Sequence, residues 1–323
     1  MPDGIVGLGT AQAASIALPV PPGLLPVTPP GLVAAGSIFE QPQELAHTPI
    51  LEEGVSEIVD AAVARIAGGS ARLGLYQENN AAGIGEVQAL VPLYEGYRMA
   101  VFTQFGALSN REDARERWTG SMGLGQRWFW EDRQTDGRFI GYNVFLDHEL
   151  DQTGRRGGIG AELQYDWVSL SSNYYFPLSG WRTAATEENR RERPMEGWDA
   201  QIRGNIPCIP YLSMTGSYAW WNRADGNAED SAPAATWEYG LELSPYSWFS
   251  SFVARRFTGE NIKDTVLGVT LSWDFTLPWE KRLPVRPAFS SPEKMAEKEG
   301  LEKRHQFIRR NNELDLVYSL DEE

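Results

Sequence analysis

Residues 139–150, FIGYNVFLDHEL, alternate apolar and polar side chains, which is the period-2 pattern of a β-strand with two different faces. One face carries, together with His148, large apolar side chains: Ile140, Tyr142, Val144, Leu146 and Leu150. The other carries small or polar side chains, with Phe145 as an exception: Gly141, Asn143, Asp147 and Glu149. The stretch therefore predicts a strand with an apolar environment on one side and a polar environment on the other.

Similar strands recur along the chain, and the links between them alternate in length. About 12 segments of roughly 8 to 12 residues lie between Arg72 and Phe275, with the clearest alternation at 159–166, 198–206 and 267–275. Alternation is poor at 97–107 and 247–257, so the sequence leaves those registers open. Long polar links are expected at 108–116, 177–197, 222–235 and 258–264, and tight links at 94–97, 166–168, 207–210 and 244–247. The link 129–138 is an exception, because it is longer than the tight links expected at the same end of the strands. This pattern is typical of an all-β fold, a 12-stranded antiparallel transmembrane outer-membrane β-barrel.

A soluble β-sandwich also alternates, with its apolar residues facing inward. The tryptophans favour the barrel, because all 12 follow residue 117 and most lie near strand ends. Such positions suit an aromatic girdle, in which amphipathic rings sit at the level of the lipid headgroups. The predicted girdle consists of Trp118, Trp128, Trp167, Trp198, Trp220, Trp237, Trp248 and Trp273.

Composition and motifs exclude several kinds of function. The net charge of -15 argues against a nucleic-acid partner, which would require clustered Lys and Arg. The three histidines lack metal-ligand spacing, and Asp147, His148 and Glu149 point alternately to opposite faces of their strand. We therefore expect no catalytic, cofactor or metal site and no enzymatic activity. The single cysteine, Cys208, is expected in a turn.

Four regions are expected along the chain. Residues 1–50 form a Pro-rich export region; Ala11-Gln12-Ala13 resembles a signal-peptidase site but lacks a basic segment before it, which suggests a start site further upstream. Residues 51–70 contain a periplasmic helix, which could equally pack on any β domain, and 71–276 form the barrel. Residues 277–323 form a linker that traverses the pore, with a polar helix from Ser291 through 293–310 and an extended stretch that alternates at Leu314, Leu316 and Tyr318.

Several runs resemble the β-domain of the intimin and invasin family, the inverse autotransporters. They are IGYNVFLDHEL (140–150), RRGGIGAELQYDWVSLSSNYYFPLSGWR (155–182), ERPMEGWDAQIRGNIPCIPYL (192–212) and RRNNELDLVY (309–318). The resemblance implies a 12-stranded outer-membrane barrel, a periplasmic N-terminus and a linker through the pore to an exported adhesin of immunoglobulin-like domains. It also implies that the linker fills the pore with Arg309, Arg310, Asn311 and Asn312. No such passenger lies within the 323 residues.

The side chains expected to face the lumen, hydrate it and hold the linker are Asn143, Glu162, Gln164, Asp199, Gln201 and Arg203. The charged loop 182–198 could bind a ligand or stay solvated with internal ion pairs, and Arg193 could brace it. The expected function is a translocator and anchor that displays its C-terminal segment; the alternative is a plugged channel or structural barrel. Expected partners are outer-membrane lipid, the barrel-assembly and periplasmic chaperone machinery, and a C-terminal passenger encoded downstream.

Overall fold

Twelve strands close into an antiparallel ring in the structure, a computed structural model that describes residues 69–78, 84–112, 115–130, 138–184, 190–222, 235–258, 262–275, 280, 283–290 and 305–320. The strands of the ring are β1 (Ser70–Glu78), β2 (Ile84–Glu95), β3 (Met99–Glu112), β4 (Arg115–Phe129), β5 (Phe139–Glu149), β6 (Arg155–Tyr165), β7 (Val168–Pro177), β10 (Gly197–Asn205), β11 (Leu212–Trp221), β12 (Ala235–Leu243), β13 (Phe249–Thr258) and β14 (Ile262–Asp274). A separate sheet contains β8 (Arg182–Thr183), β9 (Arg190–Pro194) and β15 (Leu316–Leu320).

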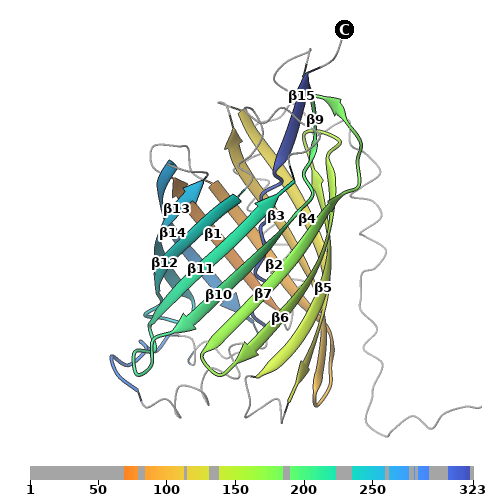
Figure 1. Cartoon of the computed structure of the whole chain (residues 1–323). Helices are drawn as coiled ribbons and strands as arrows, with labels where there is room; N and C mark the ends of the chain where they lie inside the picture. Colours follow the sequence, from red (N-terminus) through yellow and green to blue (C-terminus); the bar gives the residue numbers. More distant parts are fainter. Residues whose placement is uncertain are drawn as a thin grey trace, which may run out of the picture. The chain divides into compact units, whose positions relative to one another are not determined.

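Backbone hydrogen bonds close the ring between its first and last strands. Each strand pairs with its neighbour in sequence, except that β7 pairs with β10, because β8 and β9 lie outside the ring. Ser70 pairs with Asp274 and Glu78 with Val266, so β1 and β14 match along their length. Figure 1 shows the strands tilted around the barrel. The predicted 12-stranded antiparallel barrel is therefore confirmed.

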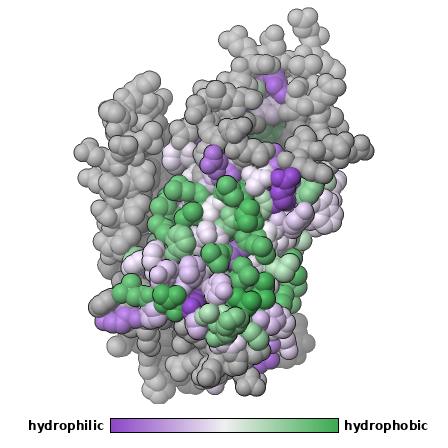
Figure 2. Space-filling view, turned by 90° about the vertical axis from the view of Figure 1, so that its left-hand side faces the viewer, coloured by the Kyte–Doolittle hydropathy of each residue, from purple (hydrophilic) through white to green (hydrophobic). Residues whose placement is uncertain are grey.

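Burial along β5 shows how the alternation divides inside from outside. Every odd-numbered residue from Phe139 to Glu149 is buried, whereas Ile140, Tyr142, Val144 and Leu146 are about half exposed. The same division holds in β6 and β14, where Ile159, Leu267 and Leu271 are exposed. Figure 2 shows apolar side chains gathered over the strands. A soluble sandwich would bury these side chains, so the exposed apolar face fits a barrel in lipid.

The links lie at two ends of the barrel. One end, which we call proximal, carries the start of β1, the end of β14 and the links 96–98, 166–167, 206–211 and 244–248. We call the opposite end distal. The expected girdle tryptophans divide between them. Four lie proximally: Trp128, Trp167, Trp248 and Trp273; four lie distally: Trp118, Trp198, Trp220 and Trp237.

Two proximal links contain a non-glycine residue with a positive φ. Asp166 has a φ of 45° in the link between β6 and β7, and Cys208 has a φ of 69° in the link between β10 and β11. Aspartate tolerates the left-handed region better than most residues, which suits a tight turn. The expected turn position of the exposed Cys208 is confirmed.

Two links that were expected to be long are short, and these predictions are wrong. Residues 108–112 continue β3 and pair with residues 115–119 of β4, and Thr258 of β13 still pairs with Ile262 of β14. The polar composition of these stretches suggested loops. Strand pairing depends on main-chain hydrogen bonds, however, so a hairpin can continue beyond its apolar band with polar side chains.

Inward aromatic rings explain the strands that alternate poorly. Phe102 of β3 lies directly opposite Gly125 of β4, and a side chain at Gly125 would collide with the Phe102 ring. Phe252 of β13 has the same relation to Gly268 of β14. Each ring covers a glycine across the strand pair, so an apolar residue stands where the period-2 pattern calls for a polar one.

Several expected features lie outside the described residues. They are the export region 1–50, nearly all of the helical region 51–70, most of the link 129–138 and residues 291–304 of the linker. Among the described residues, no helix has the length and apolar character needed to cross a bilayer.

The orientation of β10 generates a first prediction. Ile202 faces outward and is 48 % exposed, whereas Gln201 faces the lumen. Ile202→Arg should destabilise the folded barrel by about 2 to 4 kcal/mol, because a charge at the middle of the lipid layer is costly. The matched change Gln201→Arg should have little effect, since its side chain enters a hydrated cavity. Heat-modifiable gel migration after urea titration measures both, and equal loss in the two variants would contradict the assigned faces.

Candidate functional site

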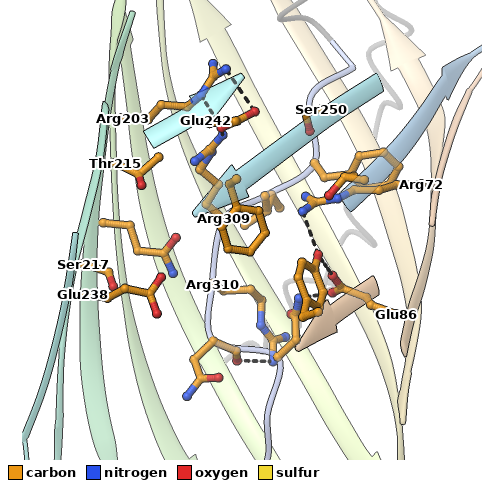
Figure 3. Close-up of a pocket in the computed structure, with 18 of the residues that line it drawn as sticks. Arg72, Glu86, Arg203, Thr215, Ser217, Glu238, Glu242, Ser250, Arg309 and Arg310 are labelled. Carbon is orange, nitrogen blue, oxygen red and sulfur yellow. Dashed lines mark hydrogen bonds and ion pairs between the residues drawn. The ribbon is translucent and has the colours of Figure 1, made fainter. Parts of the chain in front are cut away.

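Residues 305–315 lie along the inward face of the barrel wall. At the proximal end the imidazole Nε2 of His305 lies 2.6 Å from Oε1 of Glu95, and its Nδ1 lies 3.7 Å from Oδ2 of Asp274. At the distal end the amide of Met195 donates to the carbonyl of Asp315 at 2.9 Å. Figure 3 shows Arg309 and Arg310 on this segment, with barrel strands on both sides. The segment therefore has contacts at both ends of the barrel.

An apolar cluster holds the proximal half of the segment. Phe307 and Ile308 are buried against three inward residues of the wall, Leu90, Phe102 and Phe145. Phe145 was the exception in the sequence pattern of β5, and its inward position provides part of this contact. The burial of Phe307 and Ile308 is hydrophobic, so it stabilises the position of the segment without a charge.

Asp147 forms the most buried ionic contact of the site. Its Oδ2 accepts from Nε of Arg156 at 3.0 Å and also from Arg310 of the segment. The side chains of Asp147 and Arg156 are 0 % exposed and that of Arg310 is 1 % exposed. Arg310 also lies 4.2 Å from the centroid of the Phe145 ring. Because one buried carboxylate serves two guanidinium groups, this contact is most sensitive to the loss of the carboxylate.

Asp199 forms a second contact, next to the first. It accepts from Oη of Tyr175 at 2.5 Å and from Nδ2 of Asn173 at 2.8 Å. The amide of Asn311 donates to Oδ2 of Asp199 at 2.8 Å and to Oη of Tyr175 at 2.9 Å. The ring centroid of Tyr175 lies 4.4 Å from the guanidinium carbon of Arg156, so the contacts of Asp147 and Asp199 are neighbours on the inward face of the barrel.

The remaining predicted linker residues contact other parts of the wall. Nη2 of Arg309 lies 3.8 Å from Oε2 of Glu242, which also accepts from Nε of Arg203 at 2.9 Å. Nδ2 of Asn312 donates to Glu86. All four residues from Arg309 to Asn312 thus have a polar partner in the wall.

The predicted lumen residues divide into three groups. Asp199 bonds the segment directly, and Glu162 acts through Arg127, whose Nε donates to it at 2.7 Å. Gln201 and Arg203 line a cavity of about 800 Å³ beside the segment. The other two residues are buried away from that cavity: Asn143, which lies next to Asn173, and Gln164, which caps the turn 166–167 by donating to the carbonyls of Asp166 and Val168.

At the distal end the segment becomes a strand. β15 pairs antiparallel with β9, and Leu316 and Tyr318 pack on Ala184 with Leu314 beside them. The expected alternation at Leu314, Leu316 and Tyr318 is therefore confirmed. The charged loop 182–198 accordingly supplies a strand partner for the C-terminal segment.

Buried charges hold this distal sheet to the barrel. The carboxylate of Glu192 is 0 % exposed and pairs with Arg117 at 3.1 Å and with Arg182 at 2.9 Å. The guanidinium carbon of Arg193 in β9 lies 4.9 Å from the ring centroid of Trp181, the residue that precedes the loop.

One linker prediction is wrong and several residues were missed. His305 lies in a turn and residues 306–310 have no helical structure, although the sequence favoured a helix through 310. Bonds from the wall to the main chain of the segment replace those that a helix would make within itself. The main partners that sequence reasoning missed are Gln104, Arg127, Arg156, Asn173 and Tyr175. Their inward period-2 positions were the available signal.

Groups of His, Cys, Asp and Glu that could bind a metal are absent from the described part of the chain. In the lumen, Asp147 of the barrel pairs with Arg156 of the barrel and with Arg310 of the segment. The arrangement can therefore hold a polypeptide.

The shared role of Asp147 generates a second prediction. Asp147→Asn should destabilise the barrel by about 3 to 5 kcal/mol, because it leaves two buried guanidinium groups without their carboxylate. Arg310→Met should cost much less, since Asp147 keeps Arg156. The midpoint of urea unfolding, followed by gel migration, measures both variants. A larger loss in Arg310→Met would contradict the shared pairing.

Comparison with known proteins agrees with this architecture. The sequence matches the family described as inverse autotransporter, beta-domain, over residues 50–312. It is 29 % identical over 256 residues to intimin from Escherichia coli O127:H6, covering 77 % of this chain and 25 % of that protein. It is 25 % identical over 235 residues to invasin from Yersinia enterocolitica, covering 71 % of this chain and 26 % of invasin. The chain thus spans about a quarter of the length of these relatives.

Two further relatives extend the comparison. The inverse autotransporter adhesin YeeJ of Escherichia coli K12 is 30 % identical over 213 residues, covering 63 % of this chain and 8 % of YeeJ. A solved chain reported under "Unveiling the Mechanism Behind the in-meso Crystallization of Membrane Proteins" superposes with a TM-score of 0.65 at 25 % identity, covering 78 % of this chain and all of the other. The fold and these relatives assign the chain to the bacterial outer membrane. The chain belongs to the family of inverse autotransporter β-domains.

Proposed function

We propose that this outer-membrane barrel anchors and exports a C-terminal extension, with residues 277–323 as the linker that passes through the pore. The observation that carries the proposal is the buried pair between Arg310 and Asp147, midway between the proximal contacts of His305 and the distal pairing of β15 with β9. A chain held at both ends and in the middle of the lumen is suited to anchoring whatever follows it.

The proposal includes an orientation. The proximal end faces the periplasm, together with the N-terminal region, and the distal end faces the cell exterior. Outer-membrane barrels have short periplasmic turns and longer external loops, and the proximal turn 166–167 contrasts with the distal link between β7 and β10. In this orientation β15 emerges at the cell surface. The partners are outer-membrane lipid, the barrel-assembly and periplasmic chaperone machinery, and a passenger that follows residue 323.

The family argues for a non-enzymatic role, and one relative is named an adhesin. By analogy, the exported part of this protein would serve adhesion. The 800 Å³ cavity beside the segment favours a second candidate function, a plugged outer-membrane channel without a passenger. The gene sequence after codon 323 separates the two: a continuing frame that encodes repeated β domains supports export, and a stop codon supports the plugged channel.

Removing the segment generates a third prediction. Deletion of residues 291–323 should raise the single-channel conductance in planar bilayers severalfold, because the linker no longer occupies the lumen. The deletion keeps residues 283–290, whose Ser290 amide donates to the carbonyl of Cys208 at 3.1 Å at the proximal end. Heat-modifiable migration of both proteins serves as the folding control, and an unchanged conductance would contradict a linker in the pore.

Surface labelling tests the orientation. An epitope placed after Glu323 should bind antibody on intact cells, whereas an epitope placed before residue 56 should bind only after the outer membrane is permeabilised. The two epitopes are matched in sequence, so that access alone differs between them. Labelling of the N-terminal epitope on intact cells would reverse the proposed orientation.

A further inference from the structure

The barrel wall bonds the main chain of the C-terminal segment as well as its side chains. Seven hydrogen bonds connect wall side chains with main-chain groups at residues 306, 308, 309, 311 and 313. The bonds come from six side chains, which we call the main-chain track: Gln104, Arg127, Arg156, Asn173, Tyr175 and Asp199. They bond five of the eight residues from 306 to 313.

The track supplies both donors and acceptors. Arg127 donates to the carbonyl of residue 306 at 2.7 Å, and Arg156 donates to those of residues 311 and 313 at 2.9 and 2.8 Å. In the other direction, Oε1 of Gln104 accepts from the amide of Ile308 at 3.0 Å. An extended chain has no hydrogen bonds within itself, so a partner must satisfy its buried main-chain groups. The track does for this segment what a neighbouring strand does in a sheet.

The track residues are oriented by the wall itself. Arg127 donates to Glu162 at 2.7 and 3.0 Å and lies 4.5 Å from the ring centroid of Phe102. Arg156 is held by Asp147. These partners belong to the strands, so the wall itself contributes to the orientation of both arginines. Fixed donors bind a ligand at a smaller entropic cost than mobile ones.

The opposite side of the lumen leaves room for side chains. The 800 Å³ cavity borders the segment and is lined by small hydroxyl residues among others, including Thr215, Ser217 and Ser250 (Figure 3). Arg309 of the segment faces this cavity and keeps 28 % of its side chain exposed. Side chains on that face can vary without disturbing the bonded main chain.

We propose that the inward wall formed by β3, β4, β6, β7 and β10 is a binding site for the main chain of extended polypeptide, with little restriction on side chains. The inference rests on the proposed function and names its substrate class. Because the six side chains contact main-chain groups, they can hold successive stretches of a chain in passage. The pair between Arg310 and Asp147 then selects the register in which the chain stops.

Proline substitution in the full chain tests the track, since proline removes the amide donor. Ile308→Pro removes the hydrogen bond to Gln104, and Asn311→Pro removes those to Tyr175 and Asp199. Both variants should raise single-channel conductance severalfold. Gln306→Pro is the matched control and should leave conductance unchanged, because the track bonds the carbonyl of residue 306 and not its amide.

Hydrogen exchange of the unmodified protein gives a second measurement that requires no variant to fold. The amides of Ile308 and Asn311 should exchange more slowly than those of Phe307 and Arg309, which the track does not bond. On the wall, Gln104→Met should speed exchange at Ile308 severalfold, whereas Gln104→Glu keeps an acceptor and should preserve protection.

The outcomes separate the two proposals. Higher conductance in the proline variants alone supports the track. An equal rise in Gln306→Pro would overturn it, because the loss of an amide bonded by the track would then not be the cause. If deletion of residues 291–323 raises conductance while both proline variants keep the conductance of the unmodified protein, the result supports the linker in the pore and contradicts the main-chain track. An unchanged conductance after that deletion would contradict both the linker in the pore and the main-chain track.

Discussion

Closure of the sheet is the constraint on which the other features depend. In a lipid environment a strand edge would leave amides and carbonyls without partners, so β1 must pair with β14 along its length. Closure in turn creates an interior that lipid cannot reach and that water enters only from the ends. Inward side chains must therefore find partners among themselves or on a chain inside the barrel. The ionic pairs, the rings over glycines and the contacts of residues 305–315 all answer this requirement.

The charges of the lumen explain why an arginine lies at the centre of the segment. Elsewhere the wall pairs its own charges, as in Arg127 with Glu162 and Arg256 with Glu238. Around Tyr175, however, the wall supplies two acidic groups, Asp147 and Asp199, and a single guanidinium, Arg156. Arg310 brings the second guanidinium. The segment therefore adds a positive charge where the wall carries an excess of negative charge.

The sequence predicted the faces of the strands because period-2 alternation depends on the environment of each strand and needs no knowledge of its partner. Ile140 to Leu146 in β5 illustrate this, and Arg309 to Asn312 were identified through family resemblance. Features that depend on contacts between distant residues were not predictable in this way. Phe145 broke the pattern because Phe307 and Ile308 pack on it. Residues 306–310 favoured a helix locally, but wall side chains bond their main chain, and tertiary contacts outweigh a modest helical propensity.

The same distinction between local and distant contacts applies within the lumen. Main-chain groups are alike in every residue, so the bonds that Gln104 and Asn173 make are available to any extended chain that passes. The contact of Arg310 with Asp147 and the Phe145 ring depends on one side chain at one position. The main-chain bonds give affinity without selecting which residue of the segment lies at a given position. The contact of Arg310 with Asp147 selects one residue at one position. Pairing of β15 with β9 is again a main-chain contact, and it lies at the distal end of the barrel. Together the two kinds of contact suit the proposed function, in which a polypeptide moves through the pore and ends in one defined arrangement.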